Sequence, residues 1–217
     1  MKKLLLITGD IAAGKTTFSK ILSARYGAAV FQKDTVKEIL GDCIGFQNRE
    51  ENKALSNAAI DVMCHIFSRI SPTKADLILE ANFHEKELQK LHQIAKERQY
   101  DVLTLVLRGD ADVLYERYMH RIHAENRHPV HLSTTLDVRE NFMKIAEFIR
   151  KETILGETLT VEATDFAYQS DPVILHRIDD FMKKYFFREV RFLKQVAQSG
   201  IGGYNSFYIA RNLSNFP

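Results

Sequence analysis

Five short apolar runs alternate along the chain with longer segments whose apolar residues return every three or four positions. Short apolar runs without polar alternation are typical of strands buried on both faces of a parallel sheet. They predict strands at residues 4–7, 28–31, 76–80, 102–107 and 158–162. The periodic segments predict helices at residues 15–26, 34–40, 48–70, 85–98, 112–122, 136–150 and 172–185.

Capping and turn residues mark where several of these elements begin or end. Gly27 is expected to end the first helix and Gly41 the second, because glycine accepts the left-handed conformation common at helix C-termini. Asp34 is placed to cap the N-terminus of the second helix. Pro172 suits the first position of the last helix. The alternation of strands and helices predicts the α/β class, with one parallel sheet covered by helices on both faces.

The composition is that of an ordinary globular protein. The 217 residues are 45% hydrophobic and 27% charged, and a formal net charge of +2 demands neither a nucleic-acid partner nor a membrane partner. Cys43 and Cys64 have no metal-binding or disulfide spacing. The apolar run after Lys3 is too short for a signal peptide, and no stretch approaches the roughly 18 apolar residues of a membrane span. We therefore expect a soluble, cytoplasmic protein.

The charge is unevenly distributed, because a basic segment ends the chain. Residues 181–217 hold six Lys or Arg side chains and a single Glu, with aromatic residues interspersed among them. We expect one domain over residues 1–185 and a basic aromatic extension over residues 186–217. The extension could pack on the domain, become ordered on binding a partner or form a subunit contact. The sequence leaves its role and the oligomeric state open.

A complete phosphate-binding motif of the form G-x-x-x-x-G-K-T joins the first predicted strand to the first predicted helix. Its residues are Gly9, Asp10, Ile11, Ala12, Ala13, Gly14, Lys15 and Thr16. The glycines let the backbone curl so that successive N–H groups point at phosphate oxygens, and the helix N-terminus adds partial positive charge. We expect Lys15 to reach the β- and γ-phosphates, Thr16 to coordinate Mg²⁺ and Thr17 to contact the α-phosphate side. The motif therefore predicts binding of a nucleoside triphosphate, taken here to be ATP, with Mg²⁺.

Three shorter motifs follow where ligand-binding residues are expected. They are Lys33-Asp34 after the second strand, Glu-Ala-Asn-Phe at residues 80–83 after the third, and Arg-His-Pro at residues 127–129. Together with the phosphate-binding motif, they make residues 2–180 resemble the P-loop small-molecule kinases, which include zeta-toxin-like, chloramphenicol-phosphotransferase-like and AAA_33-type kinases. The resemblance implies a three-layer P-loop NTPase sandwich with five parallel strands in the order 2-3-1-4-5. It also implies a mobile helical lid at about residues 117–140.

Asp34 lies three residues past the second predicted strand, at the carboxyl edge of the sheet where ligands bind in doubly wound folds. A carboxylate there can orient a substrate hydroxyl or accept its proton as the hydroxyl attacks the γ-phosphate. The resemblance implies the same role in binding substrate. The alternative is that Asp34 only caps a helix, and the two roles can coexist.

Glu80 ends the third predicted strand at the same edge. The resemblance implies that an acid here holds Mg²⁺, but many members of the family have Asp, so Glu80 departs from the pattern and could contact substrate instead. A solvated charge at a strand end is the alternative. Asn82 follows within reach of a substrate, whereas His84 is more simply explained as a surface residue.

Three arginines fall in the segment that the resemblance assigns to the lid. Arg117 and Arg121 are four residues apart and so share a helix face, and Arg127 follows in a loop. Guanidinium groups stabilise the charge of a transferring phosphoryl group, and a closing lid excludes water. The resemblance implies this catalytic role for all three. Taken singly, each could be an ordinary exposed charge.

Two other positions have open roles. Arg108 could join the lid arginines or pair with Asp110 or Asp112. Thr164 and Asp165 fall where the base-binding loop of the resembled family lies, so they could contact adenine.

Two other kinds of site fit the sequence poorly. A regulatory GTPase needs an N-K-x-D segment, and residues 52–55 lack its Asp. A metal site is conceivable at four closely spaced histidines, but no Cys or acid partners complete a tetrahedral set. These histidines are His120, His123, His128 and His131.

The main hypothesis is a kinase that transfers the γ-phosphoryl group of ATP to a hydroxyl of a small molecule. The acceptor is expected between Asp34, residues 41–60 and Asn82. A polynucleotide 5′-hydroxyl kinase or RNA-end enzyme is the second hypothesis. The aromatic residues of the extension could stack on bases, and its basic residues could attract the nucleic acid. A nucleotide-binding ATPase or switch without an acceptor is the third. The sequence alone does not identify the acceptor.

Overall fold

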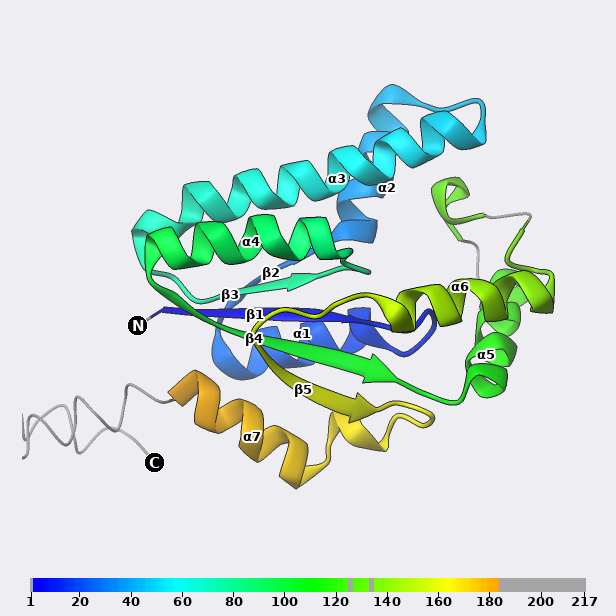
Figure 1. The fold of residues 1–217 in the computed structure, drawn as a ribbon. Coiled ribbons are helices and arrows are strands. Elements are labelled where there is room, and N and C mark those ends of the chain that lie inside the picture. Colours follow the sequence, from blue (N-terminus) through cyan, green and yellow to red (C-terminus); the bar gives the residue numbers. More distant parts are fainter. Residues whose placement is uncertain (1, 125–126, 133–134, 184–217) are drawn as a thin grey trace, which may run out of the picture. The chain divides into compact units, whose positions relative to one another are not determined.

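Five parallel strands form one sheet, shown in Figure 1. They are β1 (Lys2–Gly9), β2 (Ala29–Gln32), β3 (Leu77–Glu80), β4 (Tyr100–Arg108) and β5 (Glu157–Glu162). Their spatial order is β2-β3-β1-β4-β5, and every neighbouring pair is parallel. This confirms the α/β class and the strand order expected from the sequence.

The computed structural model describes residues 2–124, 127–132 and 135–183. The chain divides into two units between Arg177 and Ile178, and every site residue discussed below lies in the first unit. The basic extension expected at residues 186–217 lies outside the described residues. No helix of the described part is long and apolar enough to cross a membrane.

The helices follow the apolar periodicity of the sequence. They are α1 (Lys15–Tyr26), α2 (Lys33–Ile44), α3 (Arg49–Ile70), α4 (Glu85–Arg98), α5 (Ala111–Ala124), α6 (Arg139–Lys151) and α7 (Pro172–Lys183), with 3-10 turns η1 (Ser71–Thr73), η2 (Pro129–His131) and η3 (Ala167–Gln169). The Asn48 side chain caps α3 by accepting a 2.9 Å hydrogen bond from the Glu51 amide. Pro172 begins α7, as its fixed φ predicts.

Apolar packing on both faces of the sheet builds three layers. The helices α3 and α4 lie over one face (Figure 1), where Met63, Phe67 and Leu91 pack against the leucines of β1 and β3. On the opposite face, α1 buries Phe18 and Leu22. The four consecutive apolar residues of β1, from Leu4 to Ile7, have no exposed surface, as expected for a central strand between two helical layers.

The second helix differs from the expectation at both ends. Gln32 occupies the N-cap position, so Asp34 is not the cap and lies instead in the first turn of α2. The helix also continues through Gly41 and ends at Gly45, whose φ is 78°. A Cβ atom on Gly41 would lie 2.4 Å from Cγ1 of Val130, so this glycine serves a close approach between α2 and η2 rather than a helix end.

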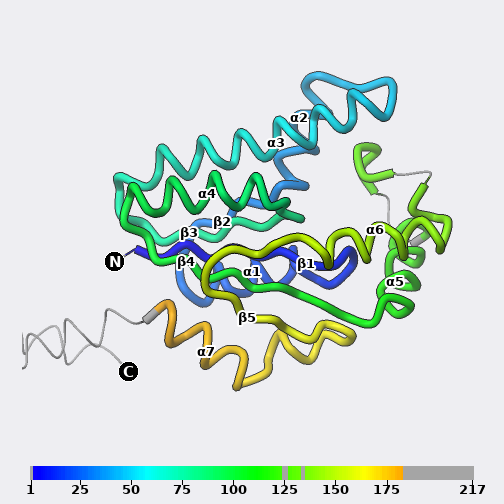
Figure 2. The backbone as a smooth tube through the Cα atoms, in the orientation of Figure 1, coloured from blue at the N-terminus to red at the C-terminus, as the bar shows by residue number. Residues whose placement is uncertain are grey.

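The register of the sheet brings the candidate site residues to one edge. Glu80 of β3 is aligned with Ile7 of β1 and with Gln32 of β2. The loop after β1 and the start of α2 therefore emerge beside Glu80. Figure 2 shows η2 lying near α2, at the same end of the sheet as α5.

Candidate active site

The loop between β1 and α1 is held in the curled shape that phosphate binding requires. Gly9 and Gly14 have φ values of 124° and 85°, and a Cβ atom on Gly9 would lie 2.1 Å from the Leu107 carbonyl oxygen. The Asp10 amide donates a 2.8 Å hydrogen bond to that same carbonyl, so the loop is fastened to β4. Only glycine allows so close an approach at this position.

The buried Asp10 side chain anchors this loop through two arginines. Its Oδ1 accepts a 2.8 Å hydrogen bond from Arg108, and its Oδ2 accepts bonds of 2.6 Å from Arg150 and 3.1 Å from the Gly109 amide. Burial alone would raise the pKa of Asp10, but the hydrogen bonds from Arg150 and Arg108 outweigh it and lower this pKa. The expected alternative pairing of Arg108 with Asp110 or Asp112 is therefore wrong.

Lys15 and Thr16 follow the loop at the start of α1. The Lys15 ammonium donates hydrogen bonds of 3.1 Å to the Gly9 carbonyl and 2.6 Å to the Asp10 carbonyl. The Thr16 hydroxyl donates a 3.1 Å bond to Oε2 of Glu80. Burial raises the pKa of Glu80 and lowers the pKa of Lys15, while the charge of each opposes the shift of the other. Glu80 is thus a buried acid, which excludes the alternative of a solvated strand-end charge.

Thr16 and Glu80 suit a magnesium ion. Mg²⁺ prefers oxygen ligands and is often held by one or two protein oxygens together with substrate phosphates. The hydroxyl and the carboxylate are already within hydrogen-bond distance of each other, beside the phosphate-binding loop. The raised pKa of Glu80, caused by burial, indicates a carboxylate that a nearby divalent cation would stabilise in its charged form.

A cavity of about 480 Å³, called the loop cavity below, opens above this loop. Its lining includes residues 11–17 together with Asp34, Glu80 and Asn82, so most predicted site residues meet in one place. Gly9 and Asp10 do not line it, because Gly9 belongs to β1 and the Asp10 side chain is directed at its two arginines.

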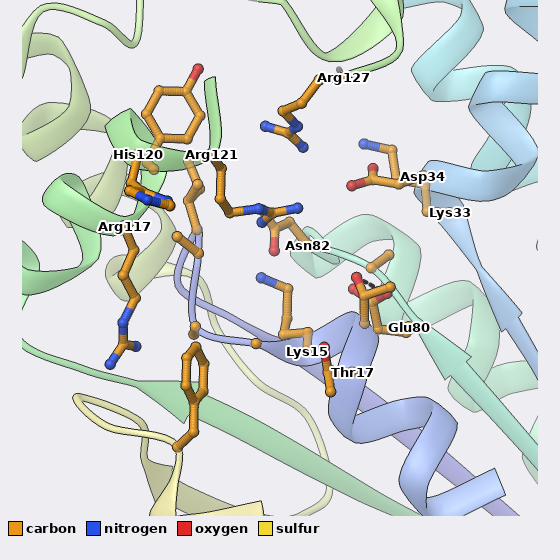
Figure 3. A pocket seen from close by; sticks show the side chains of 18 residues that line it. Lys15, Thr17, Lys33, Asp34, Glu80, Asn82, Arg117, His120, Arg121 and Arg127 are labelled. Atoms are coloured by element: carbon orange, nitrogen blue, oxygen red, sulfur yellow. Dashed lines mark hydrogen bonds between the residues drawn. The ribbon is translucent and has the colours of Figure 1, made fainter. Parts of the chain in front are cut away.

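The three predicted lid arginines line the loop cavity but differ in direction. Figure 3 shows Arg121 and Arg127 extending into the space in front of Lys15, with Asp34 facing that space from α2. Arg117 points away from Lys15 (Figure 3) and donates to the carbonyls of Ala163, at 3.0 Å, and of Thr164. Arg121 and Arg127 therefore bring two guanidinium groups to the space in front of Lys15.

The loop after β5 meets the other end of the loop cavity. The Arg117 guanidinium lies 4.2 Å from the centre of the Phe166 ring, and this ring also lines the cavity. The Thr164 hydroxyl accepts a 2.7 Å bond from the Asp110 amide and is therefore engaged at the start of α5. Phe166, which the sequence analysis missed, rather than Thr164 or Asp165, presents a surface to the cavity.

A second cavity of about 550 Å³, called the side cavity below, adjoins the first. Five residues line both: Ile11, Lys33, Asp34, Tyr118 and Arg127. The rest of its lining comes from Lys37 of α2, residues 46–48, one face of the start of α3, and residues 130–132, 135 and 136. Asp34 thus stands where the two cavities meet, in the region where the sequence analysis expects an acceptor.

Two buried polar atoms at these cavities lack hydrogen-bond partners within the described residues. They are Oδ1 of Asn82, in the loop cavity, and the Tyr118 hydroxyl, in both cavities. An unpaired buried polar group is costly, so such atoms are typical of places where a ligand or water binds. Asn82 is a predicted substrate residue. Tyr118 was missed, and its position between two lid arginines is the only sequence signal.

The segment 127–132 is fastened to α2 and α3. The Val130 carbonyl accepts hydrogen bonds of 2.9 Å from the Lys37 ammonium and 3.1 Å from the Asn52 amide group. His131 is 2.8 Å from a carboxylate oxygen of Glu38. His128 is 2.9 Å from a carboxylate oxygen of Asp42. These two histidines join neighbouring elements, and the described residues contain no group of three or more His, Cys, Asp or Glu side chains placed to hold a metal.

His84 lies outside both cavities, consistent with a surface residue. Its Nδ1 is 2.7 Å from a carboxylate oxygen of Glu152, and its backbone precedes the first turn of α4. Among the residues that the sequence analysis missed, Arg150 is the other important one. It reaches Asp10 from α6, and no local motif announces that contact.

The sequence and the fold both have counterparts among known proteins. A family model described as an AAA domain, AAA_18, matches residues 5–141. The fold is similar to that of a candidate kinase from Chloroflexus aurantiacus J-10-fl, with 26% identity over 83% of this chain and 98% of that chain and a TM-score of 0.73. No curated protein matches this sequence.

Two more distant structures share the fold alone. A gluconokinase from Sinorhizobium meliloti 1021 has 13% identity, 86% and 97% coverage of the two chains and a TM-score of 0.57. Kti12 from Chaetomium thermophilum, in complex with ADP-AlF3, has 16% identity, 82% and 98% coverage and a TM-score of 0.57. The zeta-toxin-like or AAA_33-type subfamily stays a prediction. The family match and the phosphate-binding loop agree: the chain belongs to the AAA_18 family of AAA domains, with a P-loop kinase-like fold.

Proposed function

We propose that the protein is an ATP-dependent kinase that phosphorylates a hydroxyl group of a small molecule. The observation that carries this proposal is the junction of two cavities at Asp34, one above a phosphate-binding loop and the other large enough for a small acceptor. A nucleotide switch without an acceptor has no need of the side cavity. The similarity to a candidate kinase supports the same activity.

Different residues bind the triphosphate and the adenine ring of ATP. The loop amides and Lys15 hold the triphosphate, while Arg117 and Phe166 form the surface against which the adenine ring stacks. Thr16 and Glu80 would hold Mg²⁺, which neutralises phosphate charge when bound. Asn82, whose Oδ1 is unpaired within the described part of the chain, is available to the acceptor.

Phosphoryl transfer then takes place at the junction. The acceptor oxygen forms a bond to the γ-phosphorus as the bond between that phosphorus and the bridging oxygen of ADP breaks. Asp34 orients the acceptor hydroxyl and receives its proton. Arg121 and Arg127 stabilise the negative charge on the three equatorial oxygens. The segment 127–132, bonded to Lys37 and Asn52, covers the side cavity and limits access of water.

The test is a screen of hydroxyl compounds in which ADP formation and the phosphorylated product are both measured. With an accepted compound, Asp34→Asn is expected to lower kcat by about 10²–10⁴-fold while ATP affinity changes little. Asp61→Asn is the matched control, because Asp61 is exposed and pairs with Lys90 away from both cavities. Full turnover by the Asp34→Asn variant would remove Asp34 from the mechanism. ATP consumption that never depends on an added acceptor would overturn the kinase proposal.

A further inference from the structure

The side cavity has a strongly positive lining. Among the described residues, its charged lining groups are the cations Lys33, Lys37, Arg49, Lys53 and Arg127, together with one acid, Asp34. His131 also lines the cavity, but burial lowers its pKa and it pairs with Glu38. Asp34 lies at the mouth shared with the loop cavity and is assigned to the acceptor hydroxyl. The remainder of the cavity therefore presents positive charge without a carboxylate among its lining residues to balance it.

One face of α3 supplies two of these cations, Arg49 and Lys53. Arg49, Asn52, Lys53 and Ser56 all line the side cavity, and their spacing of three, four and seven residues places them on one helix face. The two acids of the first turn, Glu50 and Glu51, do not line it. The N-terminal end of this 22-residue helix adds partial positive charge in the same place.

Three of these cations are not used in internal ion pairs in the described part of the chain. Within the described residues, no ion pair is formed by Lys33, Arg49 or Lys53. A neutral acceptor would leave their mutual repulsion uncompensated, whereas an anionic acceptor offsets it and gains charge-assisted hydrogen bonds. Charge of one sign around a concave wall also attracts ligands of the opposite sign.

The wall of the side cavity is built rather than adventitious. The Lys37 side chain is buried, and its ammonium donates to Oδ1 of Asn52 and to the Val130 carbonyl, which fixes α2, α3 and η2 together. Burial and the nearby Lys33 lower the pKa of Lys37 to about 8, so two cationic groups influence each other beside the cavity. The unpaired Tyr118 hydroxyl adds a donor at the junction.

We infer that the acceptor is a small anionic hydroxyl compound, which presents its hydroxyl to Asp34 and its phosphate or carboxylate group to Arg49 and Lys53. The inference rests on the proposed function and specifies its substrate class. The volume of about 550 Å³ suits a molecule of sugar or nucleotide size rather than a polymer.

Matched acceptors test the inference through turnover. Glucose, gluconate and glucose 6-phosphate form one series and adenosine and AMP another, so that each neutral compound is compared with its carboxylate or phosphate counterpart. We expect transfer to a hydroxyl oxygen of at least one anionic member, with a kcat/KM at least tenfold below it for its neutral counterpart. The carboxylate and phosphate members distinguish the two anionic groups. Equal use of a neutral counterpart, or preferred use of an oligonucleotide in the same assay, overturns the inference.

Substitutions that remove positive charges from α3 test which residues bind the anionic group of the acceptor. Arg49→Gln and Lys53→Gln are each expected to raise KM for the anionic acceptor about fivefold, the effect of losing one partly exposed charge contact, with little change in kcat. The control is Lys86→Gln, because Lys86 is an exposed helical lysine of α4 outside both cavities. An equal effect of Lys86→Gln, or none of the α3 variants, contradicts the assignment.

A binding measurement decides the inference even without turnover. The protein is saturated with Mg²⁺ and the ATP analogue AMP-PNP, so that the phosphate-binding loop is occupied, and is titrated with inorganic phosphate or with acetate by calorimetry. We expect phosphate or acetate to bind, and the Arg49→Gln/Lys53→Gln double variant to bind about tenfold more weakly or more. Absence of anion binding to the loaded protein, or binding unchanged in the double variant, overturns the inference. Failure of phosphoryl transfer with anion binding intact would instead count against the proposed function alone.

Discussion

At the scale of single residues, the most consequential contact is the one that no motif announces. Asp10 is counted as part of the phosphate-binding loop by its position, yet its side chain is directed away from the loop cavity to Arg108 and Arg150. Arg150 is 140 residues away in the chain, so only the three-dimensional fold brings the two together. Sequence patterns identify the loop because its residues are consecutive, and they miss the anchor because its partners are not.

We predict that Asp10→Asn destabilises the protein by about 3 kcal/mol, because removing one member of a buried ion pair leaves charges without a partner. Chemical denaturation measures this change in the free energy of unfolding. Asp112→Asn is the control: its ion pair with Arg139 is exposed, so the change should stay within about 0.5 kcal/mol. Equal effects of the two substitutions would contradict the anchoring role.

The Asp10 carboxylate also predicts that the free energy of unfolding decreases at acidic pH. The pKa of Asp10 is lower in the folded protein than its ordinary value of 3.8, so its contribution is complete above that value and is lost as pH falls through the lowered pKa. The free energy of unfolding of the native protein should therefore decline below about pH 4, and the decline should be shallower in Asp10→Asn. Denaturation curves at a series of pH values measure both slopes.

Lys37 predicts a second pH effect, on binding rather than on stability. Its pKa of about 8 means that its positive charge is lost as pH rises through that value. Sulfate keeps a constant charge over this range, so its affinity for the AMP-PNP-loaded protein should fall several-fold between pH 7 and pH 9. In Lys37→Arg, whose guanidinium stays charged, the fall should be smaller. A pH-independent affinity in the native protein would show that Lys37 does not contribute.

At the scale of elements, α2 shows where a local pattern and the tertiary structure disagree. A glycine after a short periodic segment predicts a helix end, but α2 continues past Gly41 to Ile44. Val130 lies against Gly41, and this neighbour is supplied from 89 positions later in the printed sequence. The central strands β1 and β3, by contrast, agree with the prediction, because their burial on both faces leaves a continuous apolar run in the sequence.

We predict that Gly41→Ala displaces the segment 127–132, which covers the side cavity, with little change in the free energy of unfolding. The added Cβ would lie 2.4 Å from Val130, which must move, and the Lys37 and Asn52 bonds to the Val130 carbonyl move with it. Alanine is also the better helix former by about 1 kcal/mol, which offsets part of the cost of this close contact, so the net change in the free energy of unfolding should be small. The ratio of ATP hydrolysed to product formed should rise several-fold.

The control for this prediction is the double variant Gly41→Ala/Val130→Ala. Removing the Val130 side chain beyond Cβ removes the atom that the new methyl group meets, so coupling of hydrolysis to transfer should recover in part. If the double variant is as uncoupled as the sum of the two single variants, the contact between Gly41 and Val130 does not control the cover.

At the scale of the whole molecule, charge acts locally rather than through its total. The net charge of +2 is small, yet the sequence places an anionic nucleotide at Lys15 and the structure gathers further cations around the side cavity. Composition alone therefore excluded few classes of function. The strand order could be predicted, because the motifs and the resemblance that they carry imply it. From the sequence, the acceptor could be placed only near residues 41–60. The positive wall of the side cavity could not be predicted, because it combines α2, α3 and η2, which lie apart in the sequence.

Binding of nucleotide should be visible in the stability of the whole domain. A ligand that binds only the folded state stabilises it by about 2.7 kcal/mol at one hundred times its Kd, which corresponds to roughly 5–10 °C in Tm for a chain of this size. We expect AMP-PNP with Mg²⁺ to raise Tm by this order, and EDTA to remove part of the increase. Glu80→Gln should keep the part produced by AMP-PNP alone and lose the part that depends on Mg²⁺, because we propose the buried Glu80 carboxylate, which is hydrogen-bonded to Thr16, as the metal partner. Differential scanning fluorimetry measures these shifts. An equal Mg²⁺-dependent increase in Tm in Glu80→Gln and in the native protein would contradict a role in metal binding. It would favour the alternative that Glu80 contacts the acceptor.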